Sequence, residues 1–108
     1  MAETDEIVQT IERLQGELED LTVRGLRSSG PEHLGALTAL REEFERIGAD
    51  HLAGRIAGLV EAVRNDEVGA AAALLRTQAS LRVFERVLTL ETAADALRAL
   101  LQDEKGEA

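Results

Sequence analysis

The chain has 108 residues and a formal net charge of −9, and 44% of its residues are hydrophobic and 31% charged. This length predicts one domain with a single core, and the apolar content excludes an intrinsically disordered chain. The acidic balance disfavours binding to nucleic acids and anionic membranes, and the absence of cysteine excludes disulfides and thiolate chemistry.

The kinds of apolar residue favour helices. Leucine and alanine occur 17 times each, and Phe44 and Phe84 are the only aromatic residues. Strands are enriched in β-branched and aromatic side chains, whereas Leu, Ala, Glu and Arg lose little on entering a helix. We therefore predict an all-α protein.

The first predicted helix covers residues 5–26, with Thr4 or Asp5 as its N-cap. Gly16 lies in the middle of this helix, where glycine costs about 1 kcal/mol relative to alanine, so it is expected to mark a close crossing. The apolar residues alternate spacings of four and three, which is the pattern of a coiled-coil seam. They are Ile7, Ile11, Leu14, Leu18 and Leu21.

Two shorter helices are predicted at residues 31–47 and 51–64. Pro31 suits a first helical turn, and Gly48 is expected to end the first of the two with a positive φ. Asp50 is the expected N-cap of the second. Its small residues, among them Gly54 and Gly58, are expected to let a neighbouring backbone approach closely.

The remaining sequence is predicted to form helices at residues 67–88 and 90–102, or one continuous helix, because no glycine or proline occurs between positions 70 and 105. A continuous helix would measure about 50 Å, against about 20–30 Å for the earlier ones. Its exposed apolar end would then need a partner. Residues 103–108 are expected to be a frayed, charged tail. Residues 1–108 thus predict one antiparallel bundle of four to five helices.

The sequence offers no recognisable catalytic or metal-binding pattern. A helical di-metal site needs Glu-x-x-His pairs, but Gly30 and Gly48 stand three residues before His33 and His51. No His-x-x-x-His pair, glycine-rich phosphate loop or nucleophile elbow occurs. We therefore predict no catalytic, cofactor-binding or metal-binding residue, no cofactor, and a protein that is not an enzyme.

Charge is unevenly distributed along the chain. Residues 1–20 carry seven acidic side chains against one arginine, whereas the stretch 76–86 carries Arg76, Arg82 and Arg86 against Glu85. This asymmetry predicts that the first helix lies against the segment 74–88, either within one chain or between two chains.

Part of the sequence resembles a known family. Residues 20–90 resemble the helical regions that accompany SWIM-type zinc fingers in bacterial proteins, and the eleven arginines against one lysine also favour a GC-rich bacterial source. The resemblance implies an accessory helical module without a metal site, because cysteine ligands are absent. It is carried by Asp20-Leu21, Gly25-Leu26, Leu37, Leu40, Gly48, Leu52-Ala53, Arg55, Leu59 and Leu74-Leu75.

These observations favour a cytoplasmic, non-enzymatic module that acts by self-association, most simply as a homodimer, or by binding another protein. The N-terminus lacks a signal-peptide pattern, and no apolar run approaches the ~20 residues of a membrane span. Two alternatives are a bundle that binds an apolar ligand in its core, in space left by glycines, and a DNA-binding regulator that uses residues 51–64. The predicted interface residues are Ile7, Ile11, Leu14, Leu18, Leu21, Leu90, Leu97 and Leu101.

Overall fold

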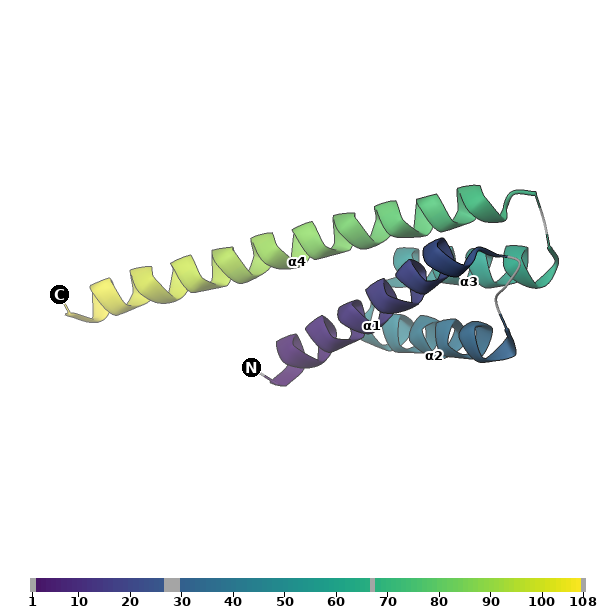
Figure 1. Cartoon of the computed structure of the whole chain (residues 1–108). Helices are drawn as coiled ribbons and strands as arrows, with labels where there is room; N and C mark the ends of the chain where they lie inside the picture. The colour runs from purple at the N-terminus through teal and green to yellow at the C-terminus, as the bar shows by residue number, and fades with distance from the viewer. Residues whose placement is uncertain (1, 27–29, 67, 108) are drawn as a thin grey trace.

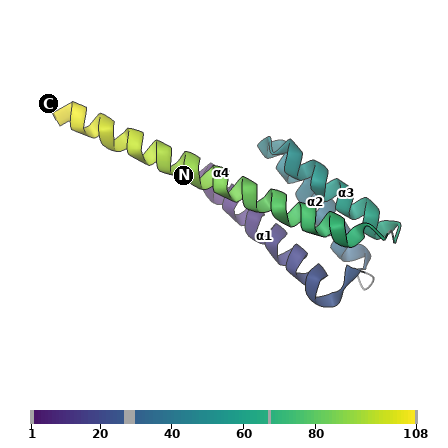
Figure 2. The same ribbon diagram turned by 90° about the horizontal axis from the view of Figure 1, so that it is seen from above.

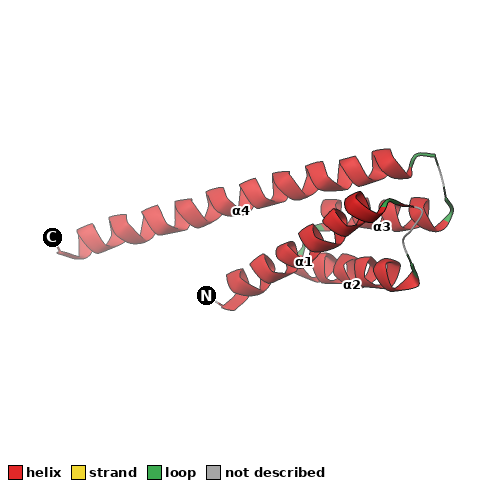
Figure 3. Ribbon diagram, in the orientation of Figure 1, coloured by secondary structure: helices red, strands yellow, loops and turns green. Residues whose placement is uncertain are grey.

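A computed structural model describes residues 2–26, 30–66 and 68–107 of the chain. These residues form four α-helices and no strand, which confirms the all-α prediction (Figures 1 and 3). The helices are α1 (Ala2–Arg24), α2 (Pro31–Ile47), α3 (Asp50–Arg64) and α4 (Ala70–Glu107).

Glycine ends two of the helices. Gly48 has φ 96°, and its N–H and that of Ala49 donate to carbonyl oxygens in the last turn of α2, as expected of a left-handed terminal residue. Gly25 has φ 85° and donates to the Leu21 carbonyl oxygen at the end of α1. The predicted cap by Asp50 is wrong. Asp50 is the first residue of α3, and the N-cap is Ala49, which makes no side-chain cap.

The bounds of the two terminal helices differ from those predicted: α1 ends at Arg24 and not at residue 26, and α4 begins at Ala70 and not at residue 67. Helix α1 starts at Ala2, so neither Thr4 nor Asp5 is its N-cap. Helix α4 has 38 residues without a break, where the sequence left one helix or two open. The segment 103–108 was expected to fray, but its residues 103–107 continue α4, and residue 108 lies outside the described residues. Between Ala70 and Lys105 no glycine or proline interrupts the helix, which accounts for its continuity over that stretch.

The core is a single apolar cluster to which all four helices contribute. Helix α3 packs against both α2 and α4, and α1 packs against α2 and more lightly against α4. Phe44 of α2 and Phe84 of α4 meet edge to face, with ring centroids 5.8 Å apart. The fully enclosed Thr77 hydroxyl lies 3.1 Å from the Arg55 carbonyl oxygen, so α4 and α3 also meet through a polar contact. The largest wholly buried apolar side chains of the core are Leu14, Leu37, Phe44, Ile56 and Leu59.

The molecule is elongated because α4 is much longer than the other helices. Its extents are 63 × 23 × 22 Å. At 1.5 Å per residue α4 is about 57 Å long, whereas the 15-residue α3 is about 23 Å. Figures 1 and 2 show the C-terminal end of α4 extending beyond the other three helices. This extension, defined here as residues 89–107, is called the α4 arm.

The mid-helix glycines do not mark close crossings, contrary to expectation. Gly16, Gly54 and Gly58 are exposed, and a Cβ atom added at any of them would meet nothing within 4 Å. These glycines therefore cannot open space inside the core, which removes the feature that motivated the apolar-ligand alternative.

Replacing Gly54 or Gly58 by alanine is expected to stabilise the bundle by about 0.5–1 kcal/mol each, because alanine lowers the backbone entropy of the unfolded chain. Gly48→Ala is the matched control. Its φ of 96° is strained for alanine, so the free energy of unfolding should fall by about 1 kcal/mol. Urea unfolding followed by circular dichroism measures all three variants, and a loss of stability in Gly54→Ala would contradict the open surface at that position.

Candidate functional site

The α4 arm carries apolar side chains that the described residues of the chain leave exposed. No residue of the arm from 89 to 103 is buried. Leu90 is 63% exposed, Leu97 58% and Leu101 50%, and the half-buried Ala94 lies between them. Together with Val87 these residues repeat at spacings of three and four, which is the pattern of a coiled-coil seam. These five residues are called the α4 stripe.

The stripe lies on a different side of α4 from the core-facing residues. In its first half, α4 faces the bundle with residues such as Leu74, Leu81 and Leu88. At 100° per residue, the stripe is rotated from that face by about 130°. Helix α4 is therefore apolar on two faces. One is used within the bundle. The other points away from it from Leu90 onward, whereas Val87 lines a surface pocket with residues 48–52 at the α2–α3 turn.

Different side chains flank the stripe on its two sides. Glu91 and Arg98 follow Leu90 and Leu97 on one side, and Arg98 also donates a 2.8 Å hydrogen bond to Asp95. Ala93 and Leu100 precede Ala94 and Leu101 on the other side, and Leu100 is 63% exposed. One flank of the stripe is thus charged with both signs, and the other is apolar.

The structure divides the predicted interface residues into two groups. Ile11, Leu14, Leu18 and Leu21 of α1 are buried in the core, and Ile7 is partly buried against it. The four buried side chains pack within the bundle, so in this fold they have almost no free surface, whereas Ile7 keeps part of its surface exposed. Leu90, Leu97 and Leu101 lie together on the exposed α4 stripe.

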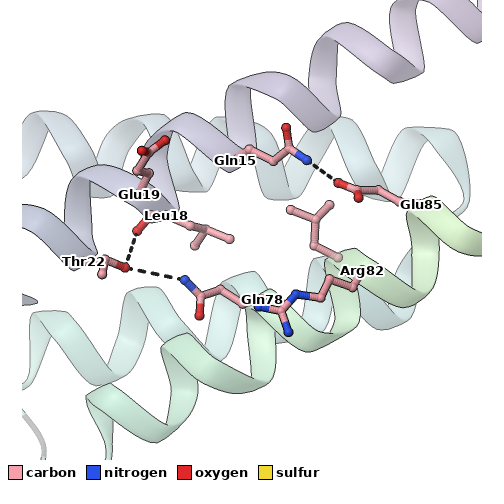
Figure 4. Close-up of a pocket in the computed structure, with 8 residues that line it drawn as sticks. Gln15, Leu18, Glu19, Thr22, Gln78, Arg82 and Glu85 are labelled. Carbon is pink, nitrogen blue, oxygen red and sulfur yellow. Dashed lines mark hydrogen bonds between the residues drawn. The ribbon is translucent and has the colours of Figure 1, made fainter.

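A surface groove of about 380 Å³ runs between α1 and α4 (Figure 4). Gln15 donates to Glu85 across it, and Gln78 lies 3.5 Å from the Thr22 hydroxyl (Figure 4). Helix α1 therefore lies beside the predicted segment of α4 within one chain. The contact is made by amide groups, and the ion pairs among the described residues do not include the arginines of segment 76–86. Leu18 and Leu81 also line the groove, so its walls are of mixed polarity.

The structure also brings Glu17, Asp20 and His33 together, which sequence reasoning did not anticipate. One donor atom from each lies within 4.8 Å of the others, and His33 Nδ1 is 3.2 Å from Glu17 Oε2. Glu17 and Asp20 are one turn apart on α1, but His33 comes from α2, so only the fold reveals the group. This group is one polar contact between α1 and α2. The ion pair between Arg13 of α1 and Glu43 of α2 is another.

Comparison with known proteins gave no matching family model, no similar curated protein and no similar solved structure. Among the described residues, no helix has a stretch apolar and long enough to cross a membrane. The exposed stripe of α4 is therefore the candidate functional site on its geometry alone.

Proposed function

We propose that this chain is a non-enzymatic helical module that associates with a second copy of itself through the α4 stripe. In this proposal the four helices form an antiparallel bundle, and the α4 arm projects from it to form a coiled coil. The proposal keeps the accessory role implied by the resemblance to helical regions beside SWIM-type zinc fingers, and it places the protein in the cytoplasm.

The observation that carries the proposal is the exposure of regularly spaced leucines on the arm. Single exposed leucines are common on soluble proteins, but a continuous apolar stripe is typical of an interaction site. Leu90, Leu97 and Leu101 are each at least half exposed, and their spacing follows one side of a helix. Covering them with a second helix removes this apolar area from water.

Self-association is favoured because the stripe is compatible with a symmetric pair. A two-fold interface uses the same residues on both copies, so the surface must complement itself. The flank with Glu91 and Arg98 contains both charges needed for this, although the whole chain is strongly acidic. An unrelated partner helix would need no such balance.

The double variant Leu90→Gln/Leu97→Gln tests the proposal. We expect the natural chain to dimerise in sedimentation equilibrium, and the variant to raise the dimer dissociation constant at least about 100-fold, because each substitution occurs twice in a symmetric interface. Both residues are exposed in the single chain, so circular dichroism should show that the helices remain folded.

Leu75→Gln is the matched control, since Leu75 lies on the same helix and is 66% exposed but falls outside the stripe. This variant should dimerise like the natural chain. A natural chain that remains a monodisperse monomer at high micromolar concentration would overturn self-association, leaving a different protein as the partner for the stripe.

A further inference from the structure

We infer that the two α4 arms pair antiparallel in a single register, in which Leu90 faces Leu101 of the second copy and Ala94 faces its Leu97. This inference rests on the proposed function and adds the direction and alignment of the pair. It follows from the sizes, charges and positions of the exposed side chains on the arm.

The sizes of the stripe residues favour this alignment. In an antiparallel coiled coil, each layer joins the two different apolar positions of the heptad. Here each small Ala94 meets a Leu97 of the other copy, and each Leu90 meets a Leu101. A parallel pair would instead place Ala94 opposite Ala94 and leave a poorly filled layer between leucine layers.

The charged flank favours the same alignment. When helices pair antiparallel in this register, Glu91 of each copy lies opposite Arg98 of the other, which gives two equivalent ion pairs. Arg98 already donates to Asp95 with one Nη atom, and its guanidinium has further donors for Glu91. Such pairs set orientation and alignment more than they add affinity.

Neighbouring registers are penalised by the same residues. Moving the pair by one heptad in one direction places Glu91 opposite Glu91, and moving it in the other direction places Arg98 opposite Arg98. Like charges at these positions are unfavourable. The charges of the arm therefore select one antiparallel register from three.

The other flank accounts for Leu100, which lies off the stripe and is 63% exposed. In the proposed register Leu100 faces Ala93 of the second copy, so both apolar flanking residues are covered. A parallel pair would use Arg86 with Glu91, but it would bring Arg98 opposite Ala93 and would leave Leu100 without this contact.

The length of the arm fits the same arrangement. The register brings the tip of each α4 to about residue 84 of the other copy. The core-facing contacts of α4 end at Leu88, so the overlap is nearly confined to the two arms. The two bundles then lie at opposite ends of a shared antiparallel arm pair.

A spin-label distance measurement tests the direction of pairing. The chain has no cysteine, so Ala79→Cys provides one labelling site, on an exposed position of α4 outside the overlap. In the proposed register the two labels are separated by about 50 Å along the axis. A parallel pair would hold them within about 25 Å, because paired helices lie side by side.

Charge reversal tests the register. Arg98→Glu should raise the dimer dissociation constant about tenfold, because it places Glu91 of each copy opposite a second glutamate. Glu91→Arg should do the same, and the double variant Glu91→Arg/Arg98→Glu should restore natural affinity. Arg98→Glu in a parallel pair would face alanine and change little.

These outcomes separate the two proposals. A short distance, or a failure of the double variant to restore affinity, overturns the antiparallel register while the dimer stands. If no dipolar coupling between two labels is detected and the chain sediments as a monomer, self-association itself is overturned. A distance near 50 Å with restored affinity supports both.

Discussion

Phe44→Ala is expected to destabilise the bundle by about 3–5 kcal/mol, the largest effect of any single truncation considered for this chain. Phe44 is completely buried, and its ring meets Phe84 edge to face across the α2–α4 contact. Removing the ring leaves a cavity and also loses the aromatic pair. Small domains have only about 5–15 kcal/mol of stability, so this loss is a large part of the total.

Urea unfolding followed by circular dichroism at 222 nm measures this effect. It should be carried out in the Leu90→Gln/Leu97→Gln background, because dimerisation would add a concentration-dependent contribution to the stability. Val23→Ala is the control. Val23 is 79% exposed, so its change should stay within about 0.5 kcal/mol. A loss below about 1 kcal/mol in Phe44→Ala would contradict the packing described for the core.

Much of the fold follows from local signals in the sequence. Pro31 starts α2 and Gly48 ends it, so α2 occupies the same residues as the predicted segment. Local signals were less informative where nothing interrupts the helix. Thr89 and its neighbours suggested a break, but no glycine or proline enforces one, and α4 passes through them. Helix ends without a breaker depend on packing and fraying, which the local sequence does not specify.

The heptad spacing identified apolar seams, but it did not show what would cover them. The seam of α1 and the stripe of α4 have the same spacing, so the sequence predicted that residues of both belong to an interface. In the fold Leu14 is fully buried, whereas Leu97 is 58% exposed. The difference arises because α1 lies alongside α2 and α4, while the arm of α4 extends past every other helix. Helix length and the turns between helices decide this.

Contacts between separate helices could not be predicted from spacing. Glu17 and Asp20 are neighbours on one helix face, which the sequence shows, but the arrival of His33 beside them depends on how α2 lies against α1. The same holds for Gln15 and Glu85, which are 70 positions apart in the chain. The charge asymmetry correctly predicted that α1 lies beside α4. It predicted arginines as the contacting side chains, whereas the hydrogen bonds between the two helices are donated by the amides of Gln15 and Gln78.

A chain truncated after Thr89 is expected to lose dimerisation completely and to keep the stability of its bundle. The deletion removes the stripe from Leu90 onward, but no residue from 90 to 103 is buried in the single chain. The free energy of unfolding of the monomer should therefore change by less than about 1 kcal/mol, mainly through fraying of the new helix end. The helical signal should fall with the loss of residues 90–107.

The intact chain should show the complementary behaviour in hydrogen exchange. No described side chain of the arm packs against the core, and a helix without tertiary contacts is only marginally stable in water. Its amides should exchange quickly at low concentration and become protected as the dimer forms, while those around Leu59 stay protected throughout. If the truncation instead lowered the stability of the monomer by more than about 2 kcal/mol, the arm would have to fold back onto the bundle. The stripe would then be covered within the chain and unavailable to a second copy.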